Sequence, residues 1–181
     1  MIHITLNQIL ASDPCADGWA KILHARGKIT EQQMQDAVDG GVVPKSYNKL
    51  ADDEAFPLSL AMESNGLDDV LWSLRCLPDE HRLWRKYAVW CARQVQHLMT
   101  DPRSTNALDV ADRHADGLAS DDELAAARAA AGDAGDAAWA AARAAARAAA
   151  VDAVDAGDAA WAAQKVKLLQ ILEAGHWVDD K

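Results

Sequence analysis

The stretch from residue 119 to residue 163 contains 25 alanines among its 45 residues, and this composition constrains the fold more than any other feature of the chain. Alanine favours the α-helix most strongly, because its side chain loses no rotamer entropy when the helix forms. An alanine face carries no nucleophile, acid or metal ligand, but it lets a neighbouring helix approach closely. The stretch therefore predicts closely packed helices and predicts no chemistry of its own.

A short segment occurs twice in this region. Residues 135–141 and 157–163 both read GDAAWAA, at a separation of 22 residues. In one continuous helix, twice an 11-residue period places both copies on nearly the same face. Alternatively, glycines end shorter helices and the following aspartates cap the next ones. We expect a break near residues 132–135 and leave residue 157 open. In both arrangements Trp139 and Trp161 are expected to pack inside the fold.

Residues that start and stop helices divide the rest of the chain into short segments. Asp13 and Pro14 are residue types that favour the N-cap and the first helical position, and the TEQQ run at 30–33 matches a capping box. The SDDE run at 120–123 repeats that pattern. The helices predicted in this way span residues 15–26, 30–40, 58–63, 67–77, 80–99 and 103–116, and a further helix begins at residue 120.

These patterns predict an all-α fold. The helix at 80–99 has apolar residues at intervals of three and four, with arginine and lysine on its other face. No alternating run of Val, Ile and Thr reaches the length of a strand. We expect a compact helical array in which helices 80–99 and 102–116 pack on an alanine-rich antiparallel helical hairpin, beside a smaller helical N-terminal part. The expected domains are residues 1–78 and 79–181.

The chain is acidic, with 28 acidic and 18 basic residues, a net charge of −10 and a pI near 4.9. Such a surface repels nucleic acid phosphates, which basic residues must neutralise, and it speeds the encounter with basic proteins. No apolar run reaches the roughly 18 residues of a membrane span, and the N-terminus lacks the pattern of a secretory signal. We therefore expect a cytoplasmic protein that binds neither membranes nor nucleic acid directly.

The three cysteines, Cys15, Cys76 and Cys91, are widely spaced along the chain. They form no CxxC pair and no zinc-binding pattern with the six histidines. Each lies beside apolar residues in a predicted helix, so we expect buried free thiols in a reducing compartment.

The sequence motifs of common enzyme sites are absent. The chain has no GxGxxG or GxxxxGK[ST] loop for phosphates, no HExxH zinc motif and no GxSxG nucleophile turn. His81, His97 and His114 lie on or beside predicted helices, without an acid or a cysteine placed to make them catalytic. We therefore expect a protein that is not an enzyme and that uses no cofactor and no metal.

Aspartates are the best candidates for contact with a partner. In the alanine-rich region they recur at every third residue, which is typical of a solvated helix face. A cation site would need further ligands from other helices. In the segment NGLDDVLW at 65–72, two aspartates complement a helix N-terminus or form an acidic corner that faces a partner. The candidate partner-binding residues are Asp68, Asp69, Asp133, Asp136, Asp152, Asp155 and Asp158.

The C-terminal part of the chain resembles a known family. Residues 84–172 carry the segments YAVWCA at 87–92, VQHL at 95–98, DPR at 101–103 and ALDVADR at 107–113, followed by the Ala/Trp/Arg region. In these segments the chain resembles an Ala- and Trp-rich immunity-protein family of bacterial polymorphic-toxin systems. The resemblance implies a small helical protein that works by binding and blocking another protein.

The N-terminal part is similar to a different group. Residues 14–77, with PCADGWAKIL at 14–23, ADDE at 51–54 and NGLDDVLW at 65–72, are similar to uncharacterised phage and prophage proteins. This similarity implies a role in conflict between phage and bacterium, or between bacteria. It implies no individual site residue.

Two functions fit these observations. The first is an acidic, non-enzymatic inhibitor or immunity-like protein, encoded by a phage or prophage, that blocks a basic or nucleic-acid-binding partner such as a nuclease or a defence complex. A counter-defence, anti-CRISPR-like role belongs to this class. The alternative is a structural protein that forms homodimers or larger oligomers through its alanine faces.

Overall fold

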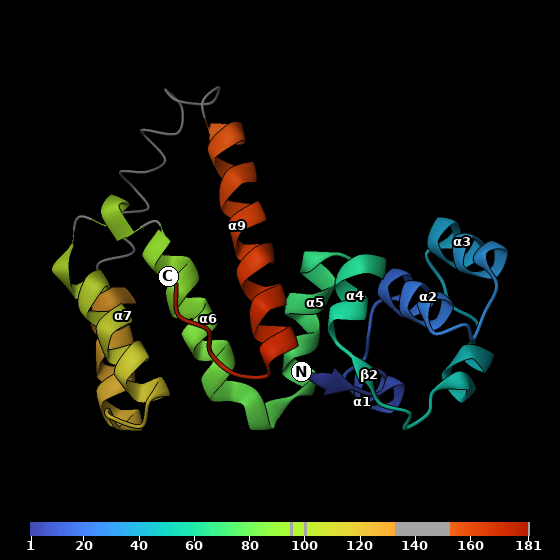
Figure 1. The fold of residues 1–181 in the computed structure, drawn as a ribbon, viewed down its shortest axis with the longest axis horizontal. Coiled ribbons are helices and arrows are strands. Elements are labelled where there is room, and N and C mark those ends of the chain that lie inside the picture. Colours follow the sequence, from blue (N-terminus) through green and yellow to red (C-terminus); the bar gives the residue numbers. More distant parts are fainter. Residues whose placement is uncertain (95, 100, 133–152, 181) are drawn as a thin grey trace. The chain divides into compact units, whose positions relative to one another are not determined.

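The computed structural model describes residues 1–94, 96–99, 101–132 and 153–180 of the chain (Figure 1). Its contacts divide the chain into two compact units: unit 1 is Met1–Asp79 with Leu168–Lys181, and unit 2 is Glu80–Lys167. Helices supply most of the regular structure in the described ranges, which confirms the all-α fold class. None of the described helices combines the length and the apolarity needed to cross a bilayer.

Three of the short helices in unit 1 begin with a capping side chain. The Thr5 hydroxyl accepts a hydrogen bond from the Gln8 backbone N–H at 3.1 Å, and the Gln8 side chain accepts one from the Thr5 N–H at 2.8 Å. The predicted capping box of Thr30 and Gln33 is confirmed. The elements are β1 (His3–Ile4), α1 (Leu6–Ala11), α2 (Ala16–Ala25), α3 (Glu31–Gly40), the 3₁₀-helix η1 (Lys45–Leu50), β2 (Phe56–Pro57), α4 (Ser59–Ser64), α5 (Leu67–Ser73) and the 3₁₀-helices η2 (Leu74–Cys76) and η3 (Pro78–Glu80), the last of which ends at the unit boundary.

A small antiparallel sheet holds distant parts of unit 1 together. β1 pairs with β2 in a register that sets Ile4 opposite Phe56, and the Ile2 N–H donates to the Leu172 carbonyl at 2.7 Å. The sequence predicts no strand, because strands of 2 residues are too short to show alternation. The side chains most completely buried lie on these strands and on the surrounding helices: Ile4, Leu6, Leu23, Phe56, Leu58, Val70, Leu168, Ile171 and Leu172.

The last helix of the chain, α9 (Ala153–Ala174), contributes to both units. Its backbone is helical through Gly157, where the sequence left a break open. The expected domains keep residues 79–181 together, whereas the structure groups the end of α9 with unit 1. The physical reason is burial, because Leu168 and Ile171 are fully enclosed in the unit 1 core.

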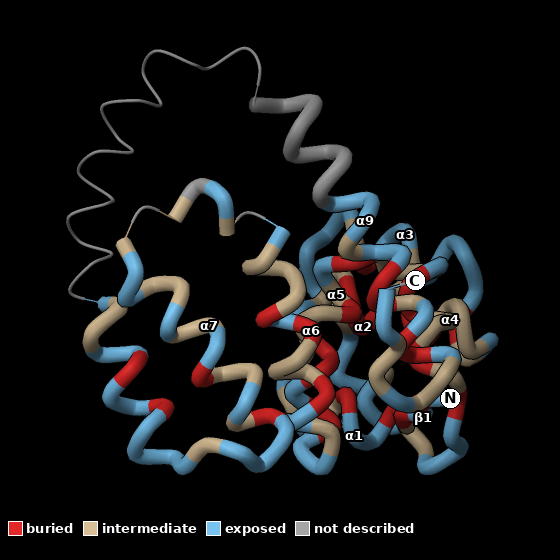
Figure 2. The backbone as a smooth tube through the Cα atoms, turned by 60° about the vertical axis from the view of Figure 1, so that its left-hand side comes forward, coloured by how far each residue is buried: buried red, intermediate tan, exposed pale blue. Residues whose placement is uncertain are grey.

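In unit 2, α6 (His81–Gln94) and α7 (Pro102–Ala115) lie side by side (Figure 2). The positions along α7 change repeatedly between buried, intermediate and exposed (Figure 2), as expected for a helix with one packed face. Val110 of α7 packs with Leu124 and Ala127 from the helical residues 121–132. The unit also includes the 3₁₀-helix η4 (Gln96–Leu98) and the first part of α9.

Ion pairs connect α6 with α7. Lys86 Nζ lies 2.8 Å from Asp116 Oδ1, and Arg93 Nη2 lies 2.9 Å from Asp109 Oδ1. Asp112 is within 3.9 Å of Lys86 and 3.5 Å of Arg93. The basic side chains that the sequence places opposite the apolar face of α6 therefore neutralise acids of α7. This part of the chain presents less free negative charge than its composition implies.

The start of α2 differs from its prediction. The sequence favours Asp13 as the N-cap and Pro14 as the first helical residue, but the structure places the N-cap at Cys15. Asp13 instead adopts a left-handed φ of 58° just before the helix. The expected burial of all three thiols is wrong for Cys15, which is exposed, and correct for Cys76. All three thiols are free.

Two predictions in the C-terminal half are also corrected. The helix predicted at 80–99 ends as an α-helix at Gln94 and gives way to η4. Trp161, expected inside the fold, is 43% exposed on α9. Trp139 and the turn of the expected alanine-rich hairpin lie outside the described residues.

Candidate functional site

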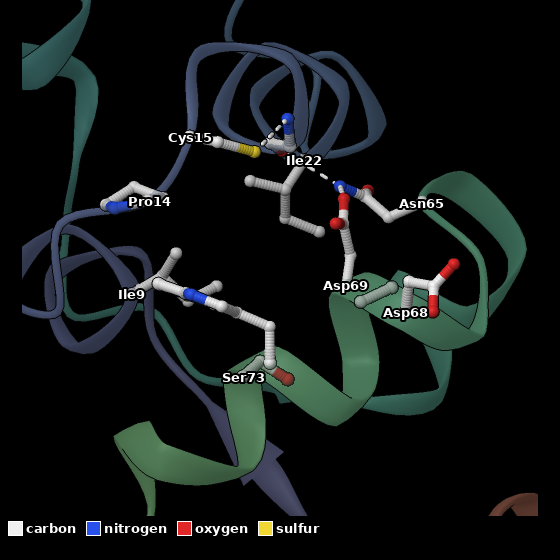
Figure 3. Close-up of a pocket in the computed structure, with 11 residues that line it drawn as sticks. Ile9, Pro14, Cys15, Ile22, Asn65, Asp68, Asp69 and Ser73 are labelled. Carbon is white, nitrogen blue, oxygen red and sulfur yellow. Dashed lines mark hydrogen bonds between the residues drawn. The ribbon is translucent and has the colours of Figure 1, made fainter. Parts of the chain in front are cut away.

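Helices α1, α2, α4 and α5 of unit 1 surround a pocket of about 270 Å³ (Figure 3). It lies wholly within unit 1. Most of its surface is apolar, and its polar groups come from the N-terminal ends of α2 and α5, from the residue that follows α4, and from Ser73 at the last position of α5. The lining residues are Ile9, Pro14, Cys15, Gly18, Ile22, Ala61, Asn65, Asp68, Asp69, Trp72 and Ser73.

The apolar wall is formed by buried side chains from three helices. Ile9 comes from α1, Ile22 from α2 and Ala61 from α4, and each is buried. Trp72 of α5 adds an aromatic surface, and the Arg75 guanidinium lies over its ring at 5.0 Å from the centroid. The wall therefore offers contact to an apolar or aliphatic group.

The polar edge is organised by Asn65. Its side-chain amide donates to Asp69 Oδ2 at 2.8 Å and to the Gly18 carbonyl at 2.9 Å. The Ser64 hydroxyl in turn donates to Asn65 Oδ1 at 2.7 Å, which orients the amide. This network fixes the Asp69 carboxylate against α2, as Figure 3 shows for Asn65 and Asp69.

The two acids reach this edge because α5 begins there. Gly66, with a φ of 88°, precedes the helix, and Asp68 and Asp69 occupy its first turn, where the helix dipole favours negative charge. Asp69 turns toward Asn65, whereas Asp68 turns outward (Figure 3) and is exposed. The pocket therefore has one fixed carboxylate and one in solvent at its margin.

Cys15 lies near the same edge (Figure 3), because a Cβ atom added to Gly18 would be 3.2 Å from Cys15 Sγ and 2.8 Å from Asp69 Oδ2. Its thiol accepts a hydrogen bond from the Gly18 N–H at 3.3 Å and so acts as the N-cap of α2. The next turn carries Lys21, whose Nζ lies 2.7 Å from Asp17 Oδ2. The hydrogen bond to Asp17 raises the pKa of Lys21, and the charge of Asp69 contributes to the same shift. The charge of Asp69 therefore acts on Lys21, which lies outside the pocket lining.

The structure brings together two of the seven aspartates proposed from the sequence. Asp68 and Asp69 both line the pocket. Asp133, Asp136 and Asp152 lie outside the described residues, and the side chains of Asp155 and Asp158 on α9 do so as well. The sequence did not indicate Ile9, Cys15 or Gly18 as site residues, because tertiary packing brings them to the pocket. The capping box of Thr5 and Gln8 could have predicted α1, the helix that carries Ile9.

A metal site is not assembled among the described residues. No group of three or more His, Cys, Asp or Glu side chains there could hold a metal ion. His114, left without a role by the sequence, bridges Arg85 and Asp121. A guanidinium can only donate, so it donates to His114 Nδ1, and His114 Nε2–H donates to Asp121 Oδ1 at 2.7 Å. His114 therefore has a structural part in unit 2.

Comparison of the chain with protein-family models, with curated proteins and with solved structures finds no match.

Proposed function

We propose that this protein acts by binding, as an acidic inhibitor or immunity-like protein that blocks a basic protein partner. One observation carries the proposal: α5 sets Asp68 and Asp69 at the edge of an apolar pocket. Apolar contact supplies affinity, and the neighbouring carboxylates select a positively charged partner. The site lacks a nucleophile paired with a base, so binding is the use that its groups support.

The charge of the whole chain supports the same choice of partner. A net charge of −10 attracts a basic protein over distances of about a Debye length, roughly 8 Å at physiological salt. It disfavours nucleic acid phosphates as direct ligands. The partner class that follows is a nuclease or another protein with a basic, nucleic-acid-binding surface, which the inhibitor would cover.

The biological setting is proposed from the sequence resemblances. The resemblance to an immunity-protein family implies binding and blocking of another protein, and the similarity to phage and prophage proteins implies a setting of conflict with bacteria. A cytoplasmic, phage- or prophage-encoded protein with immunity or counter-defence activity is consistent with the acidic pocket. An anti-CRISPR-like role is one member of that class.

Affinity capture from a bacterial lysate, followed by reconstitution of the complex from purified proteins, tests the proposal. We expect an identified basic protein whose activity falls when it is bound, with an affinity that weakens as salt rises from about 0.05 M to about 0.5 M. Double charge reversal, Asp68→Lys with Asp69→Lys, should abolish binding, whereas a control at the exposed Asp122, Asp122→Lys, should leave most of it. Equal binding by both variants would contradict the proposal.

A second candidate function is self-association through α9. Two of its large apolar side chains, Trp161 and Val166, are 43% and 56% exposed. A second copy of the chain could cover such exposed apolar surface. Light scattering over a range of concentrations should then show a dimer that Trp161→Ala converts to monomer. A monomer at all concentrations would exclude this alternative.

A further inference from the structure

We propose that the pocket between α1, α2, α4 and α5 receives a single cationic side chain, an arginine or a lysine, from the basic partner. This inference rests on the proposed function and specifies its chemistry. The aliphatic part of the side chain would lie against Ile9, Ile22 and Ala61, and its charged end would reach Asp69 and Asp68 at the edge.

The size of the pocket favours a side chain over a free small molecule. Its volume of about 270 Å³ lies below the roughly 300–1,000 Å³ of sites that enclose drug-sized ligands. Two of its lining residues, Asp68 and Cys15, are exposed, so the pocket reaches the protein surface. A group that enters from a protein surface needs such an opening.

The wall and the edge match the two parts of a long cationic side chain. Lysine and arginine bury an aliphatic stem along apolar surface while the charged head remains at a polar boundary. Here buried isoleucines form the wall, and the carboxylates stand at one margin rather than at the base. A fully apolar side chain would contact the wall but would remove water from the Asp69 oxygen positions that Asn65 does not occupy, at a cost in affinity.

Asp69 keeps free acceptor capacity for that charged head. A carboxylate offers about four lone-pair positions, and the hydrogen bond from Asn65 uses one of them on Oδ2. The same hydrogen bond holds the carboxylate in place before any ligand arrives, which reduces the entropy lost on binding. Two cations of the chain lie near the pocket, and both are engaged: Lys21 by Asp17 at 2.7 Å, and Arg75 by the Trp72 carbonyl at 2.9 Å and the Trp72 ring.

The test uses N-acetyl-arginine amide and its neutral isostere N-acetyl-citrulline amide as probes, with ¹⁵N-labelled full-length protein. A ligand of this size is expected to bind with about millimolar affinity. Titration with the arginine probe should give saturable NMR shifts at Gly18, Asn65 and Asp69. The isosteric variant Asp69→Asn should weaken binding about tenfold, since a hydrogen bond to a charged group is lost, and Asp122→Asn should leave it unchanged.

Each outcome separates this inference from the function on which it rests. If citrulline or N-acetyl-leucine amide binds as tightly as the arginine probe, or if Asp69→Asn binds normally, the cationic assignment is overturned. If the arginine probe gives no saturable shifts while the whole protein still binds a basic partner, the pocket assignment fails and the proposed function stands. If the arginine probe binds as expected but no basic partner is ever inhibited, the pocket stands and the function fails.

Discussion

Asp69 of α5 lies so close to Gly18 of α2 that a Cβ atom added to Gly18 would be 2.8 Å from Asp69 Oδ2. Because Gly18 has no side chain, the Asp69 carboxylate can approach α2 and accept a hydrogen bond from the Asn65 amide. Gly18→Ala should therefore displace Asp69, and the lost contact should offset the gain in helix propensity of about 1 kcal/mol. We expect little or no gain in the free energy of unfolding, together with weaker binding of the arginine probe.

Gly40 provides the matched control for that substitution. It lies at the end of α3, and a Cβ there would meet nothing within 4 Å. Gly40→Ala should raise stability by a few tenths to about 1 kcal/mol and leave probe binding unchanged. Urea unfolding measures the free energy of unfolding of Gly18→Ala and Gly40→Ala. An equal increase in both variants would show that Gly18 does not position Asp69.

Cys15 offers a second test of how α2 begins. A thiol is a weak acceptor, and its hydrogen bond from the Gly18 N–H is 3.3 Å long. Serine is among the preferred N-cap residues, so Cys15→Ser should stabilise the protein by about 0.5 kcal/mol, whereas Cys15→Ala should destabilise it. Thermal unfolding monitored by circular dichroism measures both. A serine variant less stable than wild type would contradict the assigned cap.

The exposure of the thiols predicts their order of reaction. Cys15 is exposed, whereas burial raises the pKa of both Cys76 and Cys91. Because the thiolate is the reactive form, iodoacetamide near neutral pH should label Cys15 first. Peptide mass mapping over time measures the order. Labelling of Cys76 before Cys15 under native conditions would be incompatible with this arrangement.

Acid should remove a stabilising charge at the start of α7. The hydrogen bond from the Arg103 side chain lowers the pKa of Asp101 to about 2, below the value of about 3.9 in an unfolded chain. Asp101 therefore binds a proton more readily in the unfolded state than in the folded state. The ionised carboxylate adds to the free energy of unfolding above about pH 4, and this stabilisation is lost as the pH falls toward 2. Asp101→Asn keeps a capping side chain but has no charge to lose. The difference in the free energy of unfolding between wild type and Asp101→Asn should shrink as the pH falls from about 6 to about 2.5. A difference that stays constant over this range would contradict the stabilising role of the Asp101 charge.

Local signals in the sequence were sufficient for much of the helix pattern. The capping boxes at Thr30 and Ser120 are confirmed, because each depends on residues within four positions of one another. The cap of α2 is the exception. Propensity favours Asp13, but the chain turns at that residue and the weaker thiol of Cys15 takes the position.

The pocket depended on contacts that no local pattern records. The sequence indicated the acidic pair on α5 but not what faces it, since Asn65 and Gly18 are 47 positions apart. The β1–β2 pair was missed for the same reason. The acids on and just after α7 were misjudged in a different way. Composition counts them as free surface charge, whereas basic side chains of α6 form ion pairs with them.

The end of α9 allows a direct test of how the chain is divided. Ile171 is fully buried and belongs to unit 1, whereas Val166, five residues earlier, is 56% exposed. Ile171→Ala should lower the free energy of unfolding by about 2–5 kcal/mol, since it removes buried methylene groups and leaves a cavity. Val166→Ala should change it by less than about 0.5 kcal/mol. Amide hydrogen exchange shows which helices are destabilised. If the end of α9 belongs to the same cooperative core as α2, α4 and α5, Ile171→Ala should speed exchange in those three helices. Faster exchange confined to α9 itself would show that this helix end is not part of the unit 1 core.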